Sequence, residues 1–237
     1  LAAAARSLGL QMHKGRLEAF SDAVIAILMT IMVLELRAPD GSDLDALRPL
    51  IPIFLTYLLS FVNLGIYWNN HHHLLQAADR VNSAMLWANL HLLFWLSLFP
   101  FATQWMGANH LASTPTAIYG VISLFAAIAY FVLQTVVVAE HGPDSAMASA
   151  LGRDLKGKIS PVLYAAGIAL AFVSTWLAIS LYVLVALTWL FPARRLAPVP
   201  RHAGPSRSPP LCPTSPRACP PAPPPRPARG AHPGPGA

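Results

Sequence analysis

Long apolar stretches separated by short polar segments occupy the first 192 residues of the chain. A bilayer core of about 30 Å needs about 20 helical residues. Four stretches meet this length, and we expect helices at residues 17–36, 47–69, 82–106 and 116–139. The last apolar block, residues 159–192, is too long for one crossing, so we divide it near Ser174-Thr175 into two short helices. The pattern predicts an all-α, polytopic membrane protein with six transmembrane helices per chain.

Basic residues between these stretches indicate the orientation, because cytosolic segments are enriched in Lys and Arg. Arg6, Lys14 and Arg16 precede the first apolar stretch, and Arg153, Lys156 and Lys158 lie between the fourth and fifth. Seven arginines follow residue 192. Six crossings with both termini in the cytosol place nearly all of these residues on the expected side.

Composition divides the chain into three parts. Residues 193–237 hold 15 of the 23 prolines and no acidic residue, so this basic segment cannot bury enough apolar area to fold. We predict a disordered Pro/Arg-rich cytosolic tail there, a six-helix transmembrane domain at 14–192, and a cytosolic N-terminal segment at 1–13. The formal net charge of +6 comes from the tail. Because no aromatic or folded platform accompanies it, nucleic-acid binding is not expected.

Metal and disulfide chemistry find little support in the sequence. Cys212 and Cys219 are the two cysteines, and neither a disulfide framework nor a four-ligand zinc set accompanies them. The consecutive histidines His71–His73 point about 100° apart on a helix, so at most two could reach one ion. No His-Glu-x-x-His pattern or nucleophile elbow occurs. We therefore expect no resident metal, no cofactor and no enzyme activity.

An acidic residue lies inside the first apolar stretch. Asp22 is about 9 Å beyond Arg16 along a helix axis, below the cytosolic headgroups, where an ionisable group is costly and needs a partner. Polar residues of the second and third stretches lie at the same depth. We predict a hydrogen-bonded network that holds three helices in register, joining the following residues: Arg16, Ser21 and Asp22 with Asn70, His71 or His72, and Asn89.

A stripe of aliphatic residues follows Asp22 on the first helix. Ile27, Thr30, Ile31 and Leu34 fall within about 100° of arc, and Asp22 is about 140° from Ile27. One face can therefore pack toward the second and third helices while the other faces away. Such a stripe is typical of lipid contact or helix packing, and the pattern alone does not reveal a pore.

The order and spacing of these residues resemble a known family. Arg16-x-x-x-Phe20-Ser21-Asp22 at the first helix, followed by Ala26-Ile27, Thr30 and Leu34-Glu35, is similar to the signature of the transmembrane-protein-175 family of potassium channels. Further matches are Trp68-x-Asn70-His71-His72, Leu86-Trp87-x-Asn89 and Pro100-Phe101. The similarity covers about residues 14–192. One six-helix unit per chain resembles the prokaryotic members.

This resemblance implies a homotetramer with the first helix of each subunit lining a central pore. It implies a pore constriction at Ile27, Ile31 and Leu34, with Thr30 as the neighbouring polar position. It also implies a helix-packing network formed by Arg16, Phe20, Ser21, Asp22, Trp68, Asn70, His71, His72, Trp87 and Asn89. The permeant ion would be K⁺, modestly selected over Na⁺ without a carbonyl filter, and the expected location is the plasma membrane.

Three other functions remain open from the residues. Asp22 and the histidines have the right chemistry for a proton channel or a proton-coupled transporter, because His titrates near neutral pH. A membrane enzyme could use His71–His73 with a metal, which metal analysis would test. The chain could also be an assembly subunit without transport, which flux from liposomes would exclude.

Overall fold

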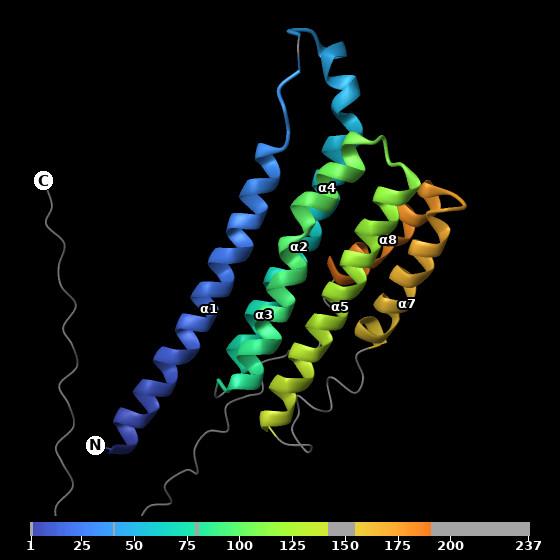
Figure 1. The fold of residues 1–237 in the computed structure, drawn as a ribbon. Coiled ribbons are helices and arrows are strands. Elements are labelled where there is room, and N and C mark those ends of the chain that lie inside the picture. Colours follow the sequence, from blue (N-terminus) through green and yellow to red (C-terminus); the bar gives the residue numbers. More distant parts are fainter. Residues whose placement is uncertain (1, 40, 79–80, 142–154, 191–237) are drawn as a thin grey trace, which may run out of the picture. The chain divides into compact units, whose positions relative to one another are not determined.

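The computed structural model describes residues 2–39, 41–78, 81–141 and 155–190. All regular elements in these ranges are helices (Figure 1). In chain order they are α1 (Ala2–Leu34), the short 3₁₀ helix η1 (Leu44–Leu50), α2 (Ile51–Ala77), α3 (Ser83–Ser97), α4 (Phe99–Ala108), α5 (Ser113–His141), α7 (Leu155–Leu170) and α8 (Thr175–Leu190). The predicted tail at 193–237 lies outside the described residues, and its disorder stays a prediction.

Four helical segments are long and apolar enough to cross a membrane. They are Lys14–Leu34, Leu44–Ala77, Ser83–Ala108 and Ser113–Glu140. The predicted break near Ser174-Thr175 is present, since α7 ends at Leu170 and α8 begins at Thr175. These two helices have 16 residues each, or about 24 Å of axis, so the count of six crossings stays a prediction. The expected end of the second helix at residue 69 was wrong, because α2 continues through the three histidines to Ala77.

Local sequence explains how the third predicted helix is divided. Pro100 lacks the backbone N–H that an uninterrupted helix would use, and its ring crowds the preceding turn. Accordingly α3 ends at Ser97 and α4 begins at Phe99, with the proline in its first turn. At the other end of α3, the side chain of Asn82 caps the helix by accepting from the backbone N–H of Met85 at 2.7 Å.

The described helices form one bundle in which α1 lies at an edge. Helix α1 packs on α2, α3 and α4, whereas α5 packs between α3 and α7, and α8 contacts α7, α2 and α5 (Figure 1). The α5–α7–α8 contact depends on two glycines. A Cβ atom at Gly120 or Gly167 would overlap the ring of Tyr182, so the small residues let Tyr182 lie fully buried between the helices.

Candidate functional site

Helix α1 has one packed face and one open face. Ser21, Ile25 and Met32 are buried against the neighbouring helices. On the other side, Ile27 is 55% exposed and Leu34 is 78% exposed. Ile31 (40%) and Thr30 share this open face. The aliphatic stripe predicted from the sequence therefore lies on a part of α1 that none of the described helices covers.

The packed face of α1 carries a fully buried polar cluster, here called the buried triad: Ser21, His71 and Asn89. The amide nitrogen of Asn89 donates to Ser21 Oγ at 2.9 Å, and its Oδ1 lies 2.7 Å from His71 Nε2. Ser21 Oγ in turn donates to the carbonyl oxygen of Leu17. Asn89 Oδ1 can only accept, so His71 must donate from Nε2, which fixes its tautomer. Through Asn89, the triad joins α3 to α1 and α3 to α2 by one hydrogen bond each.

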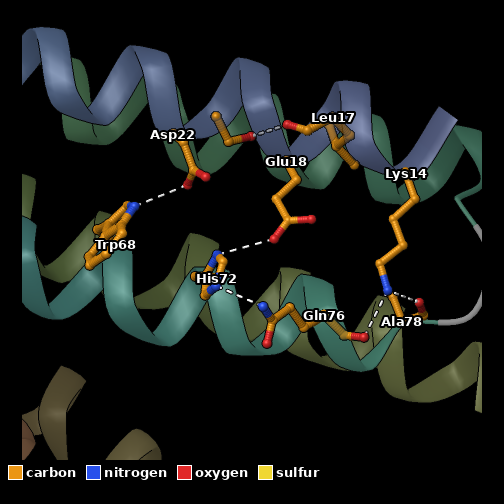
Figure 2. A network of polar contacts seen from close by, with 9 residues as sticks. Lys14, Leu17, Glu18, Asp22, Trp68, His72, Gln76 and Ala78 are labelled. Atoms are coloured by element: carbon orange, nitrogen blue, oxygen red, sulfur yellow. Dashed lines mark hydrogen bonds and ion pairs between the residues drawn. The ribbon is translucent and has the colours of Figure 1, made fainter. Parts of the chain in front are cut away.

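Three further contacts join α1 to α2 in steps of one helical turn, and we call them the polar ladder (Figure 2). Trp68 Nε1 donates to Asp22 Oδ1 at 3.0 Å. His72 Nδ1 lies 3.1 Å from Glu18 Oε1. Lys14 Nζ donates to the carbonyl oxygens of Gln76 and Ala78, both at 2.7 Å. Side chains four residues apart lie on one helix face, so two antiparallel helices meet rung by rung.

Two rungs of the polar ladder provide partners for charged or partially charged groups. The last carbonyl groups of a helix have no partner within it and carry partial negative charge. The Lys14 ammonium satisfies this need at the carboxyl end of α2. The Asp22 carboxylate, expected to lie below the headgroups, receives the indole N–H of Trp68. His72 is further held by Gln76, whose Nε2 lies 2.8 Å from His72 Nε2.

Four of the predicted network residues lie apart from these contacts. Arg16, Phe20 and Trp87 are exposed, the last two by 50% and 74%, and no hydrogen bond or ion pair ties Arg16 to another described residue. The Asn70 amide donates to the Ile66 carbonyl of its own helix at 2.8 Å. Their predicted packing role stays a prediction. Within the described residues, no group of three His, Cys, Asp or Glu side chains could hold a metal ion.

The structure also contains polar contacts that the sequence analysis missed. Lys14, Glu18 and Gln76 join the polar ladder, and their four-residue spacing to Asp22 and His72 was the available signal. A second buried cluster lies deeper in the bundle. Tyr119 OH accepts from Asn63 Nδ2 at 2.9 Å and from Ser60 Oγ at 3.3 Å. The only hint of this cluster was two polar residues three apart, Ser60 and Asn63, in an apolar stretch.

Comparison with known proteins adds three findings. A family model described as the endosomal/lysosomal potassium channel TMEM175 matches residues 16–100. A potassium channel of Chryseobacterium sp. (strain P1-3) is 52% identical over 185 residues, covering 78% of this chain and 96% of that protein. The crystal structure of a lysosomal potassium-selective channel TMEM175 homolog from Chamaesiphon minutus matches with a TM-score of 0.67 at 27% identity, covering 76% of this chain and 97% of that one.

An animal relative matches over a shorter part. The endosomal/lysosomal proton channel TMEM175 of Gallus gallus is 31% identical over 140 residues, which is 52% of this chain and 28% of that protein. The matched part of this chain therefore corresponds to about a quarter of the animal protein.

Proposed function

The chain belongs to the TMEM175 family of ion channels and is a multi-pass membrane protein, and from this premise we propose that it conducts potassium through a pore lined by α1. The supporting relatives named as potassium channels match nearly their whole length, as the 96% coverage of the Chryseobacterium protein illustrates. In this proposal the pore belongs to a homotetramer, with modest preference for K⁺ over Na⁺.

The open face of α1 is the observation that carries the proposal. Ile27, Ile31 and Leu34 are exposed in the single chain, although the polar ladder and the buried triad join the helix that carries them to its neighbours. A firmly held helix with an uncovered aliphatic stripe is suited to face copies of itself around an axis.

The proposed constriction follows from the chemistry of this stripe. Rings of Ile27, Ile31 and Leu34 offer an ion no oxygen ligand, so they close the pore sterically and by excluding water. A dehydrated Na⁺ ion is harder to bring past such rings than K⁺, because its hydration is stronger. Thr30 Oγ1 donates to the Ile27 carbonyl at 2.8 Å, which leaves its oxygen lone pairs free to hold a hydrated cation nearby.

The membrane arrangement belongs to the same proposal. With α7 and α8 counted as two short crossings, six crossings keep Lys14 and the arginines that follow residue 192 on the cytosolic side, as the positive-inside rule requires. Both termini are then cytosolic. The protein would lie in the plasma membrane of its cell.

Reconstituted flux tests the pore assignment. Purified protein in liposomes should release K⁺ faster than Na⁺, and Ile27→Asn should raise the flux of both ions and reduce the preference, because an amide wets the constriction. Val33→Asn is the matched control, since Val33 is also exposed on α1 (45%) but lies off the stripe, and its flux should equal wild type. Equal flux from Ile27→Asn and wild type would contradict the assignment.

Proton conduction is a second candidate, favoured by one observation. The Gallus gallus relative, which is 31% identical over 140 residues, is named a proton channel. Current reversal at the proton equilibrium potential, measured under opposing K⁺ and pH gradients, would support this candidate. Reversal at the potassium equilibrium potential supports the first one.

A further inference from the structure

Helices α3 and α4 carry an exposed row of aromatic side chains, here called the α3 seam. Trp87, Phe94 and Phe101 follow one another at intervals of seven residues and are 74%, 55% and 57% exposed. A spacing of seven residues keeps side chains on one helix face over about two turns. All three lie within the segment Ser83–Ala108, which is long and apolar enough to cross a membrane. The α3 seam therefore lies at membrane depth.

An imidazole beside the α3 seam makes this face better suited to protein than to lipid. His91 is exposed on α3, between Trp87 and Phe94 in the sequence. Its Nε2 accepts from Trp95 Nε1 at 3.0 Å, so the neutral ring carries its proton on Nδ1. His91 lies two residues beyond the fully buried Asn89, inside the apolar segment, where lipid chains offer that N–H no acceptor. A neighbouring protein surface can supply one.

Helix α2 has a notch in its own exposed face, here called the Gly65 notch. Phe61 and Trp68 are seven residues apart and are 39% and 43% exposed. Gly65 lies between them, within about 60° of arc on the same side of the helix. A Cβ atom at Gly65 would meet no atom of a neighbouring helix within 4 Å. A glycine with open space above it lets a helix of another chain approach closely.

The α3 seam and the Gly65 notch belong to helices that flank α1 on different sides. Asn89 of α3 bonds Ser21, whereas Trp68 of α2 bonds Asp22. On the α1 wheel, Ser21 is about 120° from Ile27 in one direction, and Asp22 is about 140° from it in the other. If Ile27 faces a central axis, α2 and α3 lie on the two flanks of α1. In a closed ring, each subunit then turns its α3 toward the α2 of the next subunit.

Depth places one side chain of the α3 seam opposite the Gly65 notch. The contact between His71 Nε2 and Asn89 Oδ1 sets these two residues at one level. Because α2 and α3 are successive crossings, they run in opposite directions. Phe94 is then about 7.5 Å above Asn89, and Gly65 is about 9 Å above His71. Rotation about an axis along the membrane normal preserves depth, so Phe94 of one subunit lies level with Gly65 of the next.

We propose that the Phe94 ring of each subunit inserts into the Gly65 notch of the next subunit, between Phe61 and Trp68. This inference rests on the homotetramer of the proposed function. The contact is heterologous, so four copies repeat it and close a ring. The aromatic residues on both sides of the notch offer the inserted ring edge and face contacts. The partner of this surface is a second copy of the same chain, and the surface is separate from the aliphatic stripe of α1.

Cross-linking between differently tagged copies tests the contact. In a chain with Cys212→Ser and Cys219→Ser, Gly65→Cys and Phe94→Cys are made separately, co-expressed with different tags and oxidised with copper phenanthroline in the membrane. We expect a covalent dimer that carries both tags. Neither variant alone should give a dimer, because a heterologous contact does not bring a residue to its own copy. As the matched control, Val162→Cys, which is 66% exposed on α7, should give no dimer with Gly65→Cys.

Filling the notch tests the packing independently. Gly65→Leu adds a side chain where the single chain has room, so the helix content from circular dichroism should be unchanged. The ratio of tetramer to monomer in native mass spectrometry should fall about tenfold, because overpacking a contact costs about 1–3 kcal/mol. Phe94→Ala in the same chain makes room for the new leucine and should restore the ratio. Phe94→Ala alone should lower it.

The outcomes separate this interface from the proposed pore. The mixed dimer, together with rescue of Gly65→Leu by Phe94→Ala, is the expected result. Absence of the mixed dimer, or an unchanged tetramer in Gly65→Leu, would overturn the interface while a tetrameric wild type leaves the proposed pore standing. A wild type that is monomeric in the bilayer would contradict both.

Discussion

The two faces of α1 differ in their contacts with neighbouring helices. The face with Ser21 and Asp22 is joined to α2 and α3 by the buried triad and the polar ladder. The face with Ile27, Ile31 and Leu34 remains exposed among the described residues. The first face thus fixes the position of the helix, and the second is available to contact groups outside these helices. This division is what we expect of a pore-lining helix that must keep its register.

Burial also separates the triad from the ladder on the packed face. All three triad residues are fully buried, whereas the side chains of His72 and Glu18 in the ladder are 31% and 22% exposed. Unpaired polar groups are costly only where water cannot replace the partner. The triad should therefore matter more for stability than the ladder.

The same substitution on the two faces should give the largest contrast. Ile25→Asn places an amide at a fully buried site and removes apolar contacts, so we expect a loss of about 4 kcal/mol in stability and little folded protein. Ile27→Asn should keep the wild-type Tm in detergent, measured by the fraction that stays monodisperse after heating. Equal losses in Tm would remove the distinction between the faces.

Breaking the buried triad should have the next largest effect. Asn89→Ala leaves Ser21 and His71 without their shared partner, and we expect a loss of about 2–3 kcal/mol and a lower Tm. Asn69→Ala is the matched control, because Asn69 is exposed on α2 and its loss should leave the Tm unchanged. A Tm for Asn89→Ala equal to that of the control would show that the triad does not hold the helices.

Weakening one rung of the polar ladder should have the smallest effect. Glu18→Gln keeps an acceptor for His72 but removes the charge, so the expected loss is below about 1 kcal/mol, as for other partly exposed pairs. The variant should show a Tm within a few degrees of wild type and unchanged K⁺ flux. A Tm drop as large as that of Asn89→Ala would place the ladder on a par with the triad.

Much of the fold could be predicted because membrane helices leave a strong pattern. The apolar stretches, and even the break before Thr175, follow from length and hydropathy alone. The meeting of Ser21, His71 and Asn89 could be anticipated for a related reason. Polar groups inside apolar helices need partners, and only a few candidates lie at the same depth.

The missed contacts have a different physical origin. Lys14, Glu18 and Gln76 lie where polar residues are easily satisfied by water, so nothing in the sequence demanded partners for them. Their pairing depends on α2 continuing to Ala77, beyond the end that hydropathy suggested. Tyr119 has both an apolar ring and a hydroxyl. In an apolar stretch of sequence the residue resembles a packing residue, so nothing indicated that its hydroxyl would need a hydrogen-bond partner.

The most direct test of a pore lined by α1 compares two neighbouring residues. In a chain with Cys212→Ser and Cys219→Ser, Leu34→Cys and Val33→Cys are exposed to a charged, membrane-impermeant thiol reagent while K⁺ flux from liposomes is recorded. Leu34 belongs to the open stripe and is 78% exposed, whereas Val33 lies off it. We predict that the reagent blocks flux through Leu34→Cys and spares Val33→Cys. Unimpaired flux through modified Leu34→Cys, or equal block of both, would contradict the account.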